Sequence, residues 1–168
     1  MAPKQTPMFG DKNTDDQPIV LLDLNFTLVG NSRLKSQQHK QKMPFRDQIK
    51  AERYRAPLID ILKPYRILLC TVRPDWHESR TLAHIASQLG WQPYESFFRA
   101  KDQNWQGFIA KKEYLLDSIF PAHGQPDDVQ YVAIESSKKT RAMFENFHIP
   151  CATAEQVIKH GSLDFLLK

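Results

Sequence analysis

Short runs of aliphatic residues recur along the chain, and the most prominent of them are followed at once by a polar residue. They occupy residues 18–24, 66–71 and 129–135, with shorter versions at 95–98 and 150–152. Continuous apolar character is typical of strands that are covered on both faces. Apolar residues at helical spacing separate these runs, at 82–89, 108–119, 140–147 and 154–167. This alternation predicts an α/β fold with three layers, Rossmann-like, around a central parallel sheet.

The helical segments carry recognisable end signals. Gly90 follows the first of them, and we expect the second to end before Pro121. In the last, Gly161 interrupts the pattern and predicts a break.

Three of the predicted strands end on side chains that can carry chemistry, namely Asp23, Thr71 and Glu135. Ligand sites of open parallel sheets form beyond the carboxyl ends of the strands, so we expect these three residues at one edge. A single polar strand end is often a turn residue or a helix cap, and that reading stays open for Thr71. Their convergence from three strands is what indicates a site.

Length and composition fit one globular domain. The chain has 168 residues, 41% of them hydrophobic and 25% charged. We expect a flexible leader at 1–17 and one domain at 18–168. No apolar stretch reaches the roughly 20 residues that a membrane helix needs, and the first residues lack the apolar core of a signal peptide, so we predict a cytoplasmic protein without membrane contact. Cys70 and Cys151 are predicted to be buried, reduced thiols.

Positive charge is concentrated in one segment. Eight basic residues and only two acidic ones, Asp47 and Glu52, lie between Arg33 and Arg55, within a formal net charge of +4 for the whole chain. The basic residues are Arg33, Lys35, Lys40, Lys42, Arg46, Lys50, Arg53 and Arg55. Such a patch can attract phosphate-bearing partners, or it can be an ordinary solvated surface.

The motifs at the strand ends resemble those of the haloacid dehalogenase-like (HAD) superfamily. DLNFT at 23–27 is similar to its first motif, LLCT at 68–71 to its second, and a downstream lysine and the acidic position in VAIESS follow in order. The stretches TVRPD and IAKKEYLLDSIF look similar to the 3′-phosphatase domain of phage polynucleotide kinases and related nucleotidases. No GxxxxGK[ST] loop is present, so a kinase half of that kind is absent from the sequence.

The resemblance implies a phosphatase that acts on phosphomonoesters, with nucleotides or polynucleotide 3′-phosphate ends as the substrate class. Asp23 would be the nucleophile and would form an aspartyl-phosphate. Mg²⁺ would be held by Asp23, the backbone carbonyl of Asn25 and the strand-end pair Glu135 and Ser136.

The remaining roles follow from the same resemblance. Thr71 would donate a hydrogen bond to the phosphoryl group, and Lys111 would balance its charge, with Lys112 as the alternative. By its position two residues after Thr71 in TVRP, Arg73 either reaches a substrate phosphate or is an ordinary loop arginine. The segment at 31–54 takes the position of a cap insertion and, at this length, is expected to hold a loop and a helix.

Two residues depart from the family pattern. Asn25 stands where these phosphatases have an aspartate that protonates the leaving group, and Ser136 replaces the second acid of the pair. Loss of a general acid and base typically costs about 10²–10⁴-fold in rate. Three interpretations follow. The first is a phosphatase whose good leaving groups need no strong acid, or whose acid is another residue such as Glu78, His77 or a cap residue. The second is a different phosphoryl-transfer or C–X-cleaving enzyme, and the third is a catalytically silent module that binds phosphate, nucleic acid or a protein.

Two further expectations concern the rest of the chain. Trp76, Trp91 and Trp105 flank the predicted helices and are interpreted as packing residues. A phospho-accepting receiver domain is the main rival fold, but its acidic pair would have to be Asp15 and Asp16, which lie in the leader.

Overall fold

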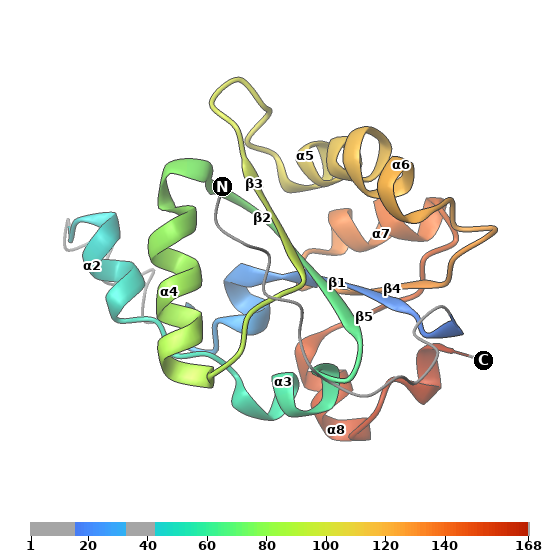
Figure 1. Ribbon diagram of the computed structural model, residues 1–168, viewed down its shortest axis with the longest axis horizontal. Coiled ribbons are helices and arrows are strands. Elements are labelled where there is room, and N and C mark those ends of the chain that lie inside the picture. The colour runs from blue at the N-terminus through green and yellow to red at the C-terminus, as the bar shows by residue number, and fades with distance from the viewer. Residues whose placement is uncertain (1–15, 33–42, 168) are drawn as a thin grey trace, which may run out of the picture.

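The sheet consists of five parallel strands, as the sequence predicts. A computed structural model describes residues 16–32 and 43–167 of the protein. The strands are β1 (Ile19–Asp23), β2 (Arg66–Pro74), β3 (Glu95–Arg99), β4 (Tyr131–Ile134) and β5 (Cys151–Ala152). Their order across the sheet is β3-β2-β1-β4-β5 (Figure 1), so β1 is central.

Strand β1 shows why its sequence is continuously apolar. All five of its residues are buried. Val20 and Leu22 pack into the cluster on one face of the sheet, whereas Ile19 and Leu21 pack into the cluster on the other. Because side chains alternate across a strand, a strand covered on both faces needs apolar residues at every position.

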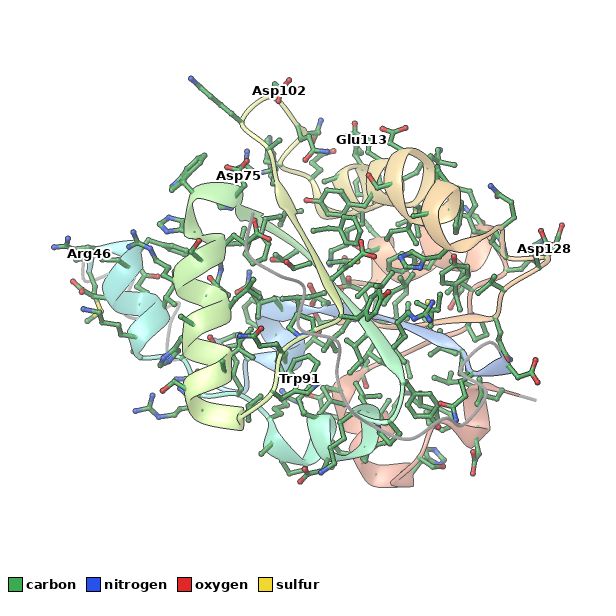
Figure 2. All side chains as sticks on the ribbon, in the orientation of Figure 1. Arg46, Asp75, Trp91, Asp102, Glu113 and Asp128 are labelled. Carbon is green, nitrogen blue, oxygen red and sulfur yellow. The ribbon has the colours of Figure 1, made fainter. Side chains whose placement is uncertain are left out.

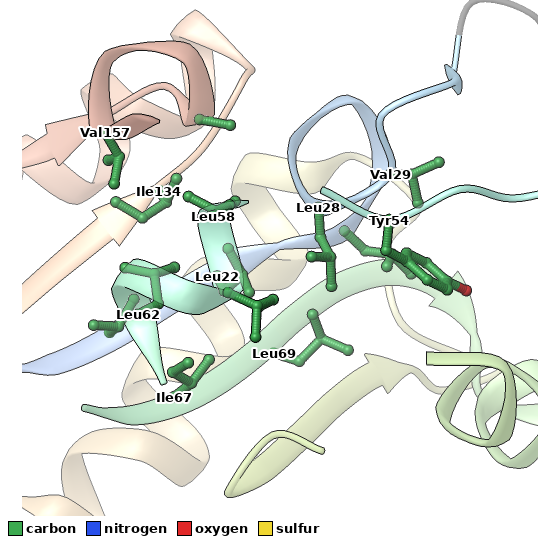
Figure 3. Close-up of a cluster of buried hydrophobic side chains, with 14 of the residues drawn as sticks. Leu22, Leu28, Val29, Tyr54, Leu58, Leu62, Ile67, Leu69, Ile134 and Val157 are labelled. Carbon is green, nitrogen blue, oxygen red and sulfur yellow. The ribbon is translucent and has the colours of Figure 1, made fainter. Parts of the chain in front are cut away.

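Helices cover both faces of this sheet. They are α2 (Phe45–Lys50), α3 (Ala56–Leu62), α4 (Glu78–Leu89), α5 (Gly107–Tyr114), α6 (Phe120–His123), α7 (Lys138–Asn146) and α8 (Ala154–His160). Helices α3, α4 and α8 lie over one face and α5, α6 and α7 over the other (Figure 1). Figure 3 shows the first of the two cores, where Leu58 and Leu62 of α3 meet Leu22 and Leu69. The three-layer α/β prediction is therefore confirmed.

The helix ends agree with the sequence signals at two glycines and differ at one proline. Gly90 and Gly161 take left-handed backbone angles, with φ of 59° and 70°, immediately after α4 and α8. Pro121 does not end its helical segment, because it lies in the first turn of α6, where a missing N–H costs no hydrogen bond. Helix α3 was not predicted from the sequence, and its apolar face covers β1 and β2.

The chain reverses its direction of travel across the sheet between β1 and β4. From β1 it moves to β2 and β3 on one side, and it later returns to β4 and β5 on the other. Adjacent strands whose connections leave in opposite directions open a crevice at their carboxyl ends. Asp23 ends β1 and Glu135 directly follows β4, so both stand at this crevice.

The insertion predicted at 31–54 is described in part, since residues 33–42 lie outside the described range. Its two ends are paired, because Val29 and Tyr54 form an antiparallel bridge and the N–H of Gly30 donates to the carbonyl of Arg53 at 2.7 Å. It contains a loop and the short helix α2, which lies beside α4 (Figure 1). Of the basic patch, Arg33, Lys35, Lys40 and Lys42 fall outside the described residues.

Several charged side chains lie at the periphery, and the two thiols are free. Figure 2 shows Arg46, Asp102, Glu113 and Asp128 pointing away from the sheet. Cys70 and Cys151 form no disulfide, as predicted, although Cys151 is only partly buried. Burial raises the pKa of both thiols to about 12, so they stay protonated.

Candidate active site

The carboxylate of Asp23 is the centre of a hydrogen-bond network at the carboxyl end of β1. Its Oδ1 accepts from the Lys111 ammonium at 2.7 Å. Its Oδ2 accepts from the Thr27 hydroxyl at 2.7 Å and from the Ser136 hydroxyl at 3.3 Å. Thr27 lies in the tight turn Leu24–Leu28 that follows β1, where Phe26 takes a φ of 60°. The turn folds the chain back, so that Thr27 supports the carboxylate four residues earlier.

Lys111 connects Asp23 with Glu135. It projects from α5, and its Nζ lies 2.7 Å from Asp23 Oδ1 and 2.5 Å from Glu135 Oε2. Lys112, the alternative in the sequence prediction, is exposed on the same helix. The structure therefore brings Lys111 rather than Lys112 to the strand ends. The catalytic role of Lys111 remains a prediction.

Burial and charge set the protonation of this cluster. Burial by itself lowers the pKa of Lys111, but the Asp23 and Glu135 carboxylates outweigh it and raise that pKa above its ordinary value. Burial raises the pKa of Glu135 to about 7; the neighbouring Asp23 carboxylate adds to the shift and Lys111 opposes it. Two carboxylates share one ammonium here, so the second of them ionises with difficulty.

Thr71 reaches the same edge from β2. Its hydroxyl accepts from the backbone N–H of Arg73 at 3.1 Å, and its carbonyl accepts from the Tyr114 hydroxyl at 2.8 Å. The first contact uses a lone pair and leaves the hydroxyl proton available, and no acceptor for it is found within the part of the chain that the structure describes. A ligand in the crevice can accept this proton.

The oxygens around Ser136 suit a hard cation. The Ser136 hydroxyl lies 3.3 Å from Asp23 Oδ2 and 3.5 Å from the Asn25 carbonyl oxygen, so one carboxylate, one carbonyl and one hydroxyl converge. Mg²⁺ accepts such ligands and completes its shell with water and substrate oxygens. Glu135 differs from the predicted ligand set, because its oxygens already accept from Lys111 and from the N–H of Ser137 at 3.0 Å. Across the described residues, no three His, Cys, Asp or Glu side chains gather into a metal cluster.

These side chains line a cavity of about 350 Å³ between the N-termini of two helices. Gln106 and Gly107 at the start of α5 form one wall, and Ser137 and Thr140 at the start of α7 form another. The first N–H groups of a helix have no acceptor within the helix and carry partial positive charge. The cavity therefore offers an anion the ends of two helix dipoles in addition to Lys111.

Arg73 is placed differently from the prediction. Its side chain is fully buried, and its two terminal nitrogens contact Glu52 at 2.8 Å each. They also donate to the Thr81 hydroxyl at 2.9 Å and to the Asn25 side-chain oxygen at 3.1 Å. A substrate phosphate would have to displace Glu52 to reach this guanidinium. We therefore leave Arg73 out of the proposed substrate-binding groups and regard it as a link between β2, the insertion and Asn25.

Several residues of the site carry no sequence signal of their own. The guanidinium of Arg141 donates to the carbonyls of Glu135 and Ser136 at 2.9 and 2.7 Å and so fixes the loop after β4. Trp105, interpreted as a packing residue, is instead 72% exposed and lines the cavity beside Asp23. It precedes α5 in a loop, where periodicity gives no information about burial.

The alternative acids lie elsewhere. Glu78 accepts from the Ser96 hydroxyl at 2.7 Å, and His77 packs against Phe45. Neither residue lines the cavity that contains Asp23.

We expect Glu135 to make the unfolding free energy depend on pH. Its pKa rises from 4.5 to about 7 on folding, so the folded state holds more protons between these values. The stabilisation that Glu135 contributes to the folded state is fully present below pH 4.5 and is lost as the pH rises through about 7. Over this interval the unfolding free energy falls by up to about 1.4 kcal/mol per pH unit. Glu135→Gln removes the titration and keeps an acceptor for Lys111. Urea unfolding should show the wild type losing stability relative to this variant as the pH rises, and a constant difference would contradict the assignment.

Comparison with known proteins identifies the fold through solved structures. No family model matches the sequence, and no curated protein matches it either. A chain of the Pnkp1/Rnl/Hen1 RNA repair complex superimposes with a TM-score of 0.61 and 16% identity, covering 90% of this chain and 46% of that one. A second structure of the Pnkp1/Rnl/Hen1 complex gives 0.59 and 16%, over 90% and 50%. The likeness establishes the fold alone. The protein spans about half the length of these chains.

Within the described residues, no helix combines the length and the apolar character that crossing a membrane requires. The cytoplasmic location expected from the sequence stays a prediction.

Proposed function

We propose that the protein hydrolyses phosphomonoesters with Asp23 as the nucleophile. One observation carries the proposal: the Asp23 carboxylate, bound to Lys111 at 2.7 Å, faces a cavity flanked by two helix N-termini. A carboxylate alone would repel phosphate. The ammonium, the helix ends and the free hydroxyl proton of Thr71 supply the attraction that a phosphoryl group needs.

The reaction would proceed in two displacements. An oxygen of Asp23 attacks phosphorus, the bond from phosphorus to the ester oxygen breaks, and the leaving group departs with the electron pair. Water then attacks the phosphorus of the aspartyl-phosphate, the bond from phosphorus to the Asp23 oxygen breaks, and inorganic phosphate leaves as the carboxylate is restored. The proton that the water loses passes to solvent, where it balances the anion of the leaving group. Lys111 stays within reach of both states and balances the charge that moves between them.

Asp23, the Asn25 carbonyl and Ser136 are the residues that would hold Mg²⁺. The cation would neutralise charge on the phosphoryl oxygens. Only one of these three ligands is a carboxylate, so we expect weak affinity that bound phosphate improves. Glu135 would act through Lys111. Its Oε2 lies 2.5 Å from the Lys111 ammonium and so fixes that ammonium beside Asp23.

Asn25, two residues after the nucleophile, would not protonate the leaving group. Asn25 is an amide, and its oxygen is held by Arg73 at 3.1 Å. Leaving groups that are stable as anions need a proton least, so we expect aryl phosphates to react faster than alkyl phosphates. The biological substrate class that we propose is the phosphorylated end of a nucleotide or polynucleotide, which is compatible with the RNA repair complex that contains the two structural neighbours.

Phosphate release from p-nitrophenyl phosphate and from thymidine 3′-monophosphate tests the proposal. We expect release by the wild type to require Mg²⁺, to stop with a chelator and to fall to background in Asp23→Asn. Asp60→Asn, an exposed carboxylate on α3 that forms a surface pair with Lys63, serves as the matched control and should behave as the wild type. If the folded wild type releases no more phosphate than Asp23→Asn, the hydrolase proposal is wrong. The protein would then be the silent binding module that the sequence also allowed.

A further inference from the structure

A second cavity adjoins the one that contains Asp23. It has a volume of about 620 Å³ and lies between α5 and α7, which pack side by side on one face of the sheet (Figure 1). Its lining consists of Phe108, Ile109, Lys112, Lys139, Ala142, Met143, Asn146 and Phe147. Phe108 and Lys139 line both cavities, so the two lie next to each other. We call this second cavity the α5/α7 groove.

The spacing of the lining residues shows that the α5/α7 groove runs along the two helices. Phe108 and Lys112 lie four residues apart on α5, and Lys139 and Met143 lie four apart on α7, so each pair shares one face of its helix. The shared residues Phe108 and Lys139 belong to the first turns of their helices. The groove therefore starts at the Asp23 cavity and follows the two helices away from it.

The chemistry of the groove favours an anion with an apolar part. Lys112 and Lys139 are its only charged lining residues, both are exposed, and neither has an ion-pair partner among the residues that the structure describes. Partly buried Phe108 and Phe147 and buried Met143 supply apolar surface between them. The ammonium groups are thus free to meet charge from outside the protein.

Trp105 adds a flat aromatic surface at the junction with the reacting phosphate. It is 72% exposed, the highest value among the large hydrophobic side chains that the structure describes, and it lines the cavity with Asp23. An exposed indole beside the proposed phosphate site offers a stacking surface for a nucleobase.

We propose that Trp105 and the α5/α7 groove form the binding site for a single-stranded polynucleotide whose terminal phosphate lies at Asp23. The terminal base stacks on Trp105, and the next backbone phosphate lies between Lys139 and Lys112. This assignment rests on the proposed function for the reacting phosphate. It adds what holds the rest of the substrate, and it places that substrate on the α5/α7 side of the sheet, away from the basic residues of α2.

Binding of a short 3′-phosphorylated oligothymidylate with a 5′ fluorophore tests the inference. All variants are made in the Asp23→Asn protein, so that binding is measured without turnover. We expect Trp105→Ala to weaken binding by about 5- to 150-fold, equivalent to about 1–3 kcal/mol. Lys112→Gln together with Lys139→Gln should reduce the slope of log affinity against log salt by about 0.7, because the two lysines share one phosphate and each lost phosphate contact contributes about 0.7 on a single strand.

Matched controls separate the groove from general surface charge. Lys159→Gln on α8 and Lys50→Gln on α2 each remove an exposed lysine, and both should leave the salt slope unchanged. Thymidine 3′-monophosphate, which has a base but no second phosphate, should respond to Trp105→Ala and not to Lys112→Gln. A phosphopeptide should bind the Trp105→Ala variant as well as it binds the parent.

The outcomes distinguish this inference from the proposed function. If the groove variants have no effect on oligonucleotide binding, or if Lys50→Gln lowers the slope as much as they do, the assignment of the groove is overturned even where p-nitrophenyl phosphate is hydrolysed. If no substrate is hydrolysed but Trp105 and the two lysines control binding, the hydrolase proposal fails and the polynucleotide site stands.

Discussion

Asn25→Asp should raise phosphate release from alkyl phosphates by about 10²–10⁴-fold. The substitution places a carboxyl group on the turn that follows the nucleophile, where it can protonate the leaving alkoxide and then take a proton from the attacking water. Asn25 lines the cavity, so the new carboxyl group stands beside the substrate, and it has to turn from Arg73, which holds the side chain of this residue at 3.1 Å, to protonate the leaving group. The neighbouring Arg73 favours the ionised form of the new aspartate, and for this reason we expect the lower part of the range.

Comparison of two substrates identifies the cause of this gain. A p-nitrophenolate leaving group needs little protonation, so release from p-nitrophenyl phosphate should rise much less than release from thymidine 3′-monophosphate. Asn25→Ala is the control, since it also breaks the contact with Arg73 but adds no acid. Equal gains on the two substrates, or the same gain in Asn25→Ala, would show that the amide is not what limits turnover.

Glu52→Gln should destabilise the protein by about 3–5 kcal/mol. Glu52 and Arg73 are fully buried side chains that meet through two contacts of 2.8 Å. Removal of one charge leaves the other in a low-dielectric interior with its hydrogen bonds only partly satisfied. A loss of this size is a large part of the 5–15 kcal/mol that typically stabilises a domain.

Two controls make the prediction specific to burial. Glu155→Gln breaks a pair with Arg55 at 2.7 Å, but the Glu155 side chain is 65% exposed, so we expect a loss of no more than about 1 kcal/mol. Glu52→Leu combined with Arg73→Met removes both buried charges and should restore most of the stability that Glu52→Gln loses. Urea unfolding of the four proteins measures these differences. Similar losses for Glu52→Gln and Glu155→Gln would show that the buried pair contributes no more than a surface one.

Arg73 connects the buried Glu52 with the candidate active site. The same guanidinium that pairs with Glu52 also holds the side chain of Asn25. Glu52→Gln should therefore loosen the turn after Asp23 as well as the insertion. Arg73 was predicted to bind substrate because it lies two residues after Thr71. Its position along the strand end does not reveal whether its side chain turns outward or inward.

The strands, the parallel sheet and most helices were predictable because they depend on local periodicity. Continuous apolar runs predicted β1, β2 and β4, and glycines predicted the ends of α4 and α8. Helix α3 was missed because it is short and has no capping side chain before it, although Pro57 lies in its first turn. The convergence of Asp23, Thr71 and Glu135 was also predictable, since parallel strands bring their carboxyl ends to one edge.

The sequence alone determined that polar groups meet at this edge, and the tertiary structure decided which side chains complete the site. Lys111 and not Lys112 meets Asp23, because the packing of α5 on the sheet sets which face of the helix turns inward. Arg73 is buried and Trp105 is exposed for a similar reason. The burial of a side chain depends on partners far away in the chain, such as Glu52 for Arg73 or Asp23 for Lys111, and local sequence patterns carry no record of those partners.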